Sequence, residues 1–409
     1  MNLKIKNIFI VFGPGIVVAA TGVGAGDLIA AAVSGAQYGY ALLWAAVLGA
    51  ILKYVMNEGI SRYQLVSGQS LLQGWKERLH PFISWYFIIY LFLWSFIVAA
   101  ALMAACGLAA HALIPALSVI QWGMIHSILA MIIVRVGKYK VVEKLMRIFI
   151  SMMFVVTILS AILIKPDLLA IFKNIVIPRV PPNSVKFILG VIGGVGGSVT
   201  LLSYGYWIRE KRWVGKAYLK RTRIDLAIAY TLTAVFGISI MIIAAGVKPE
   251  IMNGNQMVVG MADKLESVVG SFGRWFFLIG FWGAVFSSMV GVWQGIPYLF
   301  ADFHGQNKTA KISKFHVKEK EKKAYNYFLI YLSIPPMLLL LVSKPVWLVI
   351  IYAVAGSFFM PFLAFTLLIL NNKFKYLKEE VNGKITNILL VLSLLVFLYL
   401  LVIKILSRF

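Results

Sequence analysis

Thr21-Gly22-Val23-Gly24-Ala25-Gly26-Asp27 is the stretch that decides the fold of this chain. It lies inside an apolar segment from about Ile8 to Ala36, which is long enough to cross a bilayer as one helix. Each glycine lowers helix propensity by about 1 kcal/mol relative to alanine, and a carboxylate at membrane depth is costly as well. A transmembrane helix that is broken near its middle and carries an ionisable group is typical of a transporter binding site.

The composition of the whole chain indicates an all-α polytopic membrane protein. Hydrophobic residues make up 61% of the 409 and charged residues 13%, and the mean hydropathy is +0.88. Segments of spanning length can be counted along the sequence, at about 20 residues for each crossing. We expect eleven spans, near 8–36, 40–60, 81–110, 118–134, 146–164, 185–208, 224–246, 274–300, 325–342, 346–370 and 386–407.

The net charge of +24 reflects membrane topology and does not indicate a nucleic-acid partner. With eleven spans and a cytoplasmic N-terminus, 27 of the 39 Lys and Arg residues fall on the cytoplasmic side and 10 on the other. This asymmetry follows the positive-inside rule and predicts an external C-terminus. The basic loops are then expected to contact the lipid bilayer. Short loops favour a prokaryotic plasma membrane, and we expect a monomer by default.

A second interrupted span repeats the pattern of the first. In the sixth expected span, glycines are followed by hydroxyl residues, at Gly190, Gly193, Gly194, Gly196, Gly197, Ser198, Thr200 and Ser203. Broken helices at positions one and six, running antiparallel, predict an inverted repeat of five plus five spans. We expect the first repeat in residues 1–165, the second in 166–371 and an additional eleventh span in 372–409, all in one membrane domain.

Charged residues inside the other spans are few. Lys53, Glu58 and Arg62 lie on the second expected span, and Glu58 and Arg62 are four residues apart on one helical face. We expect structural roles for these charges, as an ion pair or by snorkelling to the interface. Asp225, near the start of the seventh span, is expected to offset nearby arginines, and His126 to have a packing role.

The sequence shows no sign of an enzyme or of a resident cofactor. It has neither a nucleotide-binding P-loop nor a recognisable catalytic triad, and its single cysteine, Cys106, can form no disulfide or cysteine metal cluster within the chain. A carrier of this kind is expected to take its energy from an ion gradient.

Several motifs resemble those of the Nramp family of divalent metal transporters over nearly the whole chain. Gly13-Pro14-Gly15, the helix break and Tyr38-Gly39-Tyr40 are similar to that family's first span and turn. Val66-Ser67-Gly68 and Met360-Pro361-Phe362 are similar to its V-T-G after span 2 and its L-P-F in span 10. The resemblance implies a LeuT-type fold with alternating access around broken helices 1 and 6, as the glycine pattern also predicts.

The binding motifs of the family are replaced in this chain. Where the family has Asp-Pro-Gly-Asn, the chain has Gly24-Ala25-Gly26-Asp27, so the metal-binding Asp corresponds to Gly24. Where the family has Met-Pro-His in span 6, the chain has Thr200-Leu201-Leu202. The segment from Phe82 to Ala110 also lacks the acidic residues of the family's proton route. Because transition-metal sites use soft or imidazole ligands, proton-coupled transport of Mn²⁺ or Fe²⁺ by the family's usual route is not expected.

Two kinds of substrate fit the groups that remain at the breaks. A small oxyanion such as bicarbonate would use backbone amides, with Na⁺ or H⁺ as the coupling cation, and this is the favoured interpretation. A hard divalent cation, Mg²⁺ or Mn²⁺, would use Asp27 as its metal ligand with carbonyls and hydroxyls, and a ligand sensor that does not transport is a further alternative. The small-xxx-small spacings Gly22/Gly26 and Gly193/Gly197 also suit helix packing alone. The candidate ion-binding residues are Thr21, Gly22, Gly24, Ala25, Gly26, Asp27, Gly196, Gly197, Ser198, Thr200 and Ser203.

Overall fold

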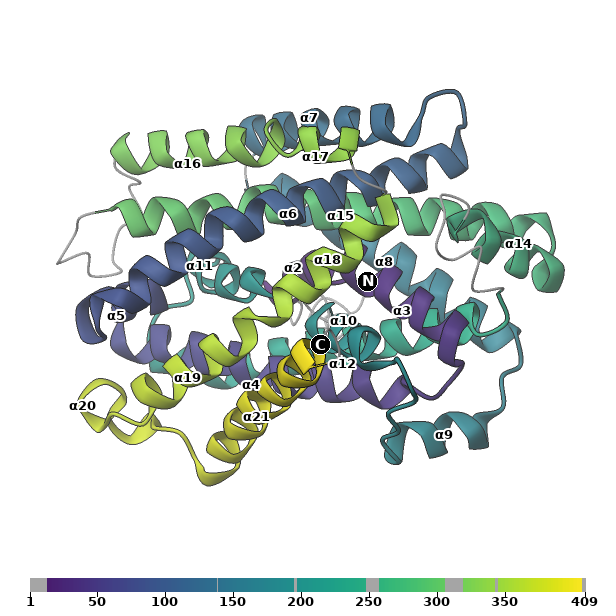
Figure 1. Ribbon diagram of the computed structural model, residues 1–409. Coiled ribbons are helices and arrows are strands. Elements are labelled where there is room, and N and C mark those ends of the chain that lie inside the picture. Colours follow the sequence, from purple (N-terminus) through teal and green to yellow (C-terminus); the bar gives the residue numbers. More distant parts are fainter. Residues whose placement is uncertain are drawn as a thin grey trace, which may run out of the picture.

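The structure is a computed structural model that describes residues 13–137, 139–194, 197–247, 257–305, 319–342 and 345–406. Throughout these ranges the chain is helical (Figure 1). The first half contains α2 (Gly15–Gly22), α3 (Ala25–Tyr38), α4 (Leu43–Ser67), α5 (Leu71–Arg78), α6 (Pro81–Leu113), α7 (Val119–Val136), α8 (Tyr139–Leu163), α9 (Leu168–Val176) and α10 (Val185–Gly194). The second half contains η1 (Val199–Leu202), α11 (Ser203–Glu210), η2 (Lys216–Tyr218), α12 (Leu219–Ala244), α14 (Met257–Val269), α15 (Ser271–His304), α16 (Glu319–Ser333), α17 (Met337–Val342), α18 (Pro345–Ser357), α19 (Phe359–Asn371), α20 (Phe374–Leu377), η3 (Lys378–Glu380) and α21 (Lys384–Leu406).

The helices account for the eleven expected spans and confirm the fold class. Within the described ranges, nine helical stretches are long and apolar enough to cross a membrane, and the shorter apolar helices Leu28–Tyr38 and Lys384–Tyr399 stand where the first and eleventh spans were expected. The first span is divided between α2 and α3, and the sixth between α10 and α11. The chain is therefore a multi-pass integral membrane protein.

Two later spans are interrupted as well. The ninth was expected to be continuous, but α16 ends at Ser333 and α17 begins only at Met337, because Pro335 and Pro336 lack the N–H groups that would continue the helix. The tenth is divided at Phe358 between α18 and α19, three residues before Pro361.

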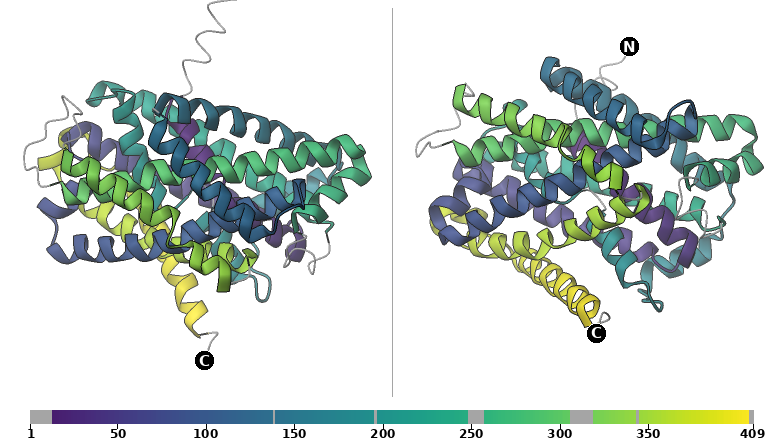
Figure 2. Two further views of the ribbon diagram at one scale, coloured as in Figure 1. Left: turned by 90° about the horizontal axis from the view of Figure 1, so that it is seen from above. Right: turned by 45° about the horizontal axis from the view of Figure 1, so that its top comes forward.

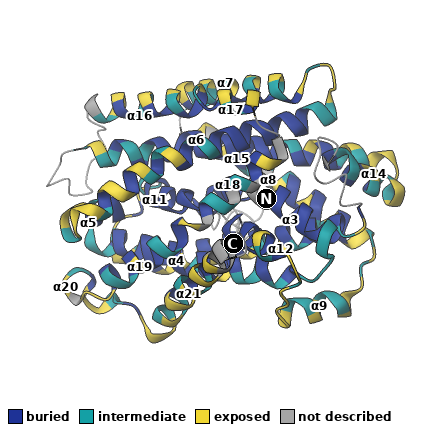
Figure 3. Cartoon of the chain, viewed as in Figure 1, coloured by how far each residue is buried: buried dark blue, intermediate teal, exposed yellow. Residues whose placement is uncertain are grey.

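The broken helices occupy the centre of the bundle. The residues of α2 are all buried, as are those of α10 from Phe187 to Gly194 and those of α11 from Ser203 to Ile208 (Figure 3). They are surrounded by α3, α4, α12, α15 and α18, whereas α7, α16 and α17 lie on the periphery (Figures 1 and 2). Backbone groups freed by a helix break are tolerated only where protein or water can satisfy them, and this arrangement places both breaks inside protein.

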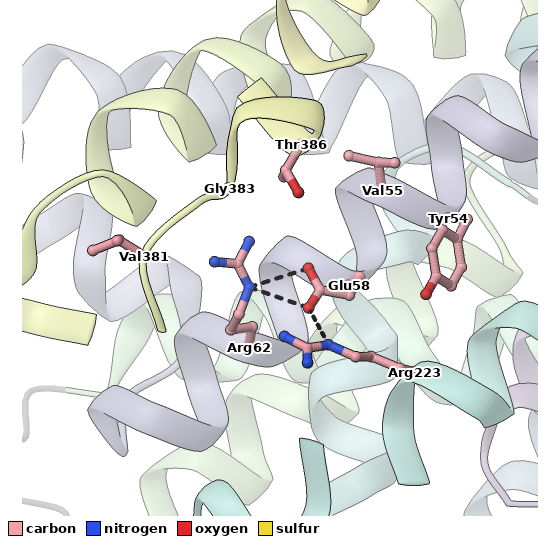
Figure 4. Close-up of a pocket in the computed structure, with 8 residues that line it drawn as sticks. All are labelled: Tyr54, Val55, Glu58, Arg62, Arg223, Val381, Gly383 and Thr386. Atoms are coloured by element: carbon pink, nitrogen blue, oxygen red, sulfur yellow. Dashed lines mark hydrogen bonds and ion pairs between the residues drawn. The ribbon is translucent and has the colours of Figure 1, made fainter. Parts of the chain in front are cut away.

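A network of charged side chains joins α4, α12 and the segment before α21 at one end of the bundle. Glu58 pairs with Arg62 at 3.1 Å, as the sequence predicts, and also with Arg223 of α12 at 2.9 Å. Arg62 Nη1 donates to the Glu380 carbonyl at 2.7 Å, and Lys216 Nζ lies 2.8 Å from Glu380 Oε1. Glu58, Arg62 and Arg223 border a cavity of about 200 Å³ between α4, α12 and α21 (Figure 4). The network attaches the eleventh span to the second and seventh.

Candidate functional site

The first break leaves two residues between α2 and α3. Val23 N still donates to Ala19 O at 2.7 Å, but Gly24 N donates only to Gly22 O at 2.8 Å, and Gly24 is extended, with φ −125° and ψ −151°. The helix then restarts at Ala25. The side chains of Ala25 and Asp27, and the surroundings of Gly26, lie outside what the structure describes, so for these candidates only the backbone at the start of α3 is placed.

Ser288 of α15 fills the space beside Gly24. A Cβ at Gly24 would overlap the Ser288 side chain, whose hydroxyl donates to Thr21 O at 2.7 Å. The Ser288 hydroxyl therefore satisfies one of the carbonyls that the break releases. Because this contact leaves no room for a side chain at position 24, glycine is required there sterically as well as for chain flexibility.

The second break is longer and includes a residue with left-handed backbone geometry. α10 ends at Gly194, and the chain resumes as the short 3-10 helix η1 and then α11. Gly197 has φ +82°, a conformation that favours glycine, and its N–H donates to Gly194 O at 2.9 Å. Gly196, another candidate, lies outside the described residues.

The two breaks lie side by side. A Cβ at Gly197 would be 3.8 Å from the Cα atom of Gly22. The structure thus brings the candidates Thr21, Gly22 and Gly24 next to the candidates Gly197, Ser198 and Thr200, which are far away in the sequence. Ser203 begins α11, one turn further on, and packs against Gly295 of α15.

Buried hydroxyl groups around the breaks have unused hydrogen-bonding capacity. Thr21, Ser198 and Ser203 are at most 4% exposed, and among the described residues none of their hydroxyl oxygens has a hydrogen-bond partner. An unsatisfied buried polar group costs about 1–3 kcal/mol, so such groups are uncommon without a ligand or an ordered water. Three of the seventeen such atoms in the described residues lie at the two breaks, where they can bond to a small polar ligand or to water.

Lys53 of α4 reaches into the second break. Its side chain is 1% exposed, and its Nζ donates to Gly193 O at 2.7 Å and also to Gly197 O. The first of these carbonyls belongs to the last turn of α10, where helix carbonyls lack partners within the helix and the dipole favours a cation. The expected snorkelling to the interface is wrong for Lys53, because this carbonyl-rich break offers its ammonium a nearer set of acceptors.

Asp225 of α12 anchors the start of α2. Its carboxylate accepts from Gly13 N at 2.9 Å, from Gly15 N at 2.6 Å and from the Tyr204 hydroxyl at 2.9 Å. The sequence suggested that it offsets nearby arginines. It does interact with the charge of Arg221, and in addition it accepts from two amides at a helix N-terminus, where a negative charge is favoured. Asp225 therefore joins the half-helix before the first break to the half-helix after the second.

These observations agree with a comparison of the whole sequence against protein families. The sequence model of the family described as Natural resistance-associated macrophage protein-like, or Nramp, matches residues 15–407. The chain belongs to the Nramp family. It is a multi-pass membrane protein of that family.

Individual relatives of this Nramp protein are distant. It is 26% identical over 285 residues to an uncharacterised protein of Pasteurella multocida. The matched region makes up 65% of this chain and 63% of the relative. It is 23% identical over 260 residues to the divalent metal cation transporter MntH of Brucella suis. That match makes up 59% of this chain and 55% of the relative. The matched regions thus span less than two thirds of each curated relative.

Solved structures confirm the LeuT-type architecture of this Nramp protein. A manganese transporter of Eremococcus coleocola superposes with a TM-score of 0.75 at 14% identity, covering 100% of this chain and 88% of that one. The transporter MhsT, solved with L-phenylalanine, superposes with a TM-score of 0.59 at 17% identity, covering 95% of this chain and 98% of that one. At these identities the likeness concerns the fold alone.

Three residues that shape the site were not identified from the sequence. Lys53 was visible as an ionisable residue inside a span, which is by itself a sign of function, but the sequence does not show which way its side chain points. Ser288 and Asp225 reach the first broken helix from α15 and α12, more than 200 residues further along the chain. Contacts over such separations depend on tertiary packing and leave no local pattern.

Proposed function

We propose that this Nramp protein carries a small oxyanion such as bicarbonate, together with a coupling cation, by alternating access at the two helix breaks. The observation that carries the proposal is the contact between Gly24 and Ser288. Gly24 stands where the Nramp pattern has its metal-binding aspartate, and Ser288 takes up the space that such a carboxylate would need. The proposed ion-binding residues are Thr21, Gly22, Gly24, Ala25, Gly26, Asp27, Gly196, Gly197, Ser198, Thr200 and Ser203.

The remaining ligand set is a poor match for a transition metal. Thr200 replaces the soft methionine ligand, and the described part of the chain holds no group of three His, Cys, Asp or Glu side chains that could bind a metal ion. Asp27 is then the one carboxylate at either break in the sequence. A single carboxylate suits a monovalent coupling cation, Na⁺ or H⁺, better than a divalent ion in a water-poor site.

Several groups at the breaks can donate hydrogen bonds. The hydroxyls of Thr21, Ser198 and Ser203 are buried and unpaired among the described residues, and Lys53 brings a positive charge to the second break. The first amides of a helix also lack partners within it and carry part of a positive charge. An oxyanion accepts hydrogen bonds on every oxygen, so it is the ligand that such a set of donors favours.

A hard divalent cation is the second candidate, favoured by what the relatives are named for. The Brucella relative is named a divalent metal cation transporter, and the Eremococcus structure is that of a manganese transporter. Mg²⁺ or Mn²⁺ would use Asp27 with break carbonyls. A sensor that binds its ligand without transporting it remains the third alternative, and it predicts ligand-dependent thermal stabilisation without flux.

Flux in proteoliposomes separates these candidates. The proposal predicts that bicarbonate changes the internal pH of vesicles containing the protein, and that internal Mn²⁺ and Mg²⁺ indicators stay silent. Thr21→Val removes an unpaired hydroxyl at the break and should slow this flux about tenfold. One hydrogen bond contributes about 1.4 kcal/mol, and a loss of that size in transition-state stabilisation lowers a rate about tenfold. Thr233→Val is the matched control, because the buried Thr233 hydroxyl donates to Ala229 O at 2.8 Å within α12. Metal uptake that is lost in Asp27→Ala would overturn the proposal.

The repeat boundaries and the membrane orientation are also proposals. We place the two inverted repeats in residues 1–165 and 166–371 and the additional span in 372–409. The N-terminus is assigned to the cytoplasm and the C-terminus to the outside, on the strength of the 27 to 10 distribution of Lys and Arg. The short loops favour a prokaryotic plasma membrane.

A further inference from the structure

Lys53 is a buried lysine inside the second half of the candidate site. It lies near the middle of α4, with ten residues before it in the helix and fourteen after it, and its side chain is 1% exposed. At this depth a lysine would ordinarily extend toward an interface, because an ammonium is costly to bury without compensating partners. In this protein it turns inward and donates to Gly193 O and Gly197 O.

The two carbonyls are the kind of ligands that a hard cation uses. Gly193 O lies at the C-terminal end of α10, and Gly197 O lies just beyond it in the unwound segment. Unwound carbonyls and half-helix C-termini are where transporters with broken helices hold their coupling ions. The Lys53 ammonium thus occupies oxygen atoms that would otherwise be available to Na⁺.

The Lys53 ammonium and a free Na⁺ cannot both bind these two carbonyl oxygens. Both would need the same lone pairs, and two positive charges within a few ångströms repel strongly where water is scarce. The nearest charged residue along the same helix, Glu58, pairs with Arg62 and Arg223 at the end of the bundle.

We propose that the Lys53 ammonium is a built-in cation that takes the place of a coupling ion at the carbonyl end of α10. The inference rests on the proposed function, because it treats the two breaks as the binding region. It also limits where a coupling cation can bind. The second break then needs no Na⁺, and any cation that accompanies the substrate binds at the first break, where Asp27 lies in the sequence.

The test measures Na⁺-dependent thermal stability of the purified full-length protein with no substrate present. NaCl is exchanged for choline chloride at constant ionic strength, and the apparent Tm is followed by tryptophan fluorescence. Wild type and Lys53→Arg should show the same response to Na⁺, limited to whatever binds at the first break. Lys53→Met and Lys53→Gln should have a lowered Tm in choline chloride that rises saturably toward the wild-type value as Na⁺ enters the vacated carbonyl site.

Lys186→Met is the matched control, since it removes a lysine from the opposite end of the same half-helix α10. Its response to Na⁺ should equal that of wild type. The inference would be overturned by neutral Lys53 variants that respond to Na⁺ no more than wild type does, or that fail to fold at every Na⁺ concentration. Because no substrate is present, this result is independent of whether bicarbonate is carried.

Discussion

Replacing Asp225 by asparagine tests whether one buried carboxylate holds the two broken helices together. Asp225 Oδ1 accepts from Gly13 N, and Oδ2 accepts from both Gly15 N and the Tyr204 hydroxyl. In either orientation, the side-chain amide of the Asp225→Asn variant presents an N–H₂ group to at least one of these donors. A lost hydrogen bond to a charged group costs about 1.5–3 kcal/mol, and the lost charge at the α2 N-terminus about 0.5–1 kcal/mol more.

The expected destabilisation is therefore about 2–4 kcal/mol. In a chain of this size it should lower the apparent Tm by several degrees, measured by tryptophan fluorescence at a fixed scan rate. Tyr204→Phe removes one of the three donors and should have a smaller effect in the same direction. Asp263→Asn is the matched control, since Asp263 is an exposed residue of α14 and should contribute less than about 1 kcal/mol. An Asp225→Asn protein as stable as wild type would refute the anchoring role.

The remaining predictions concern the first break and the charged network. Gly24→Ala should destabilise the protein by about 1–3 kcal/mol through overpacking, and adding Ser288→Gly should recover part of the loss in apparent Tm; a double variant no more stable than Gly24→Ala would contradict the steric account. The pKa of Glu380 is lowered from its ordinary value of 4.5, chiefly by the hydrogen bond from Lys216 and also by the charges of nearby arginines. A lowered folded-state pKa means that this contribution to stability is present above about pH 4.5 and is lost as the pH falls through the folded-state value. Thermal scans between about pH 6 and 3 should show this loss in wild type and a weaker one in Lys216→Met; equal slopes would count against the pair.

The broken helices could be predicted from the sequence because their cause is local. Glycines concentrated in two apolar segments, one followed by Asp27 and the other by Ser198, are sufficient to predict two interruptions and their symmetry. The Glu58–Arg62 pair is equally local, since the two residues lie on successive turns of one helix. His126 likewise has both ring nitrogens partnered, by Trp122 O at 2.7 Å and Trp282 Nε1 at 2.8 Å, which confirms its packing role.

What the sequence did not show depends on how helices are rotated against one another. The direction of Lys53 is set by the packing of α4 on α10, and the contact between Ser288 and Gly24 by the position of α15 beside the first break. Neither leaves a signal within a window of neighbouring residues. The interruption at Pro335-Pro336 is different, because its cause was visible in the sequence and its effect on the ninth span was missed.

The most direct test of the proposed substrate is to locate the bound ion between the two breaks. Crystals of the full-length protein grown with Mn²⁺ should show no anomalous difference density between Gly24 and Ser198, and crystals grown with bicarbonate should show a small planar density in contact with backbone amides or buried hydroxyls. An anomalous Mn²⁺ peak within coordination distance of Asp27 would contradict the oxyanion proposal and establish the divalent-cation alternative in its place.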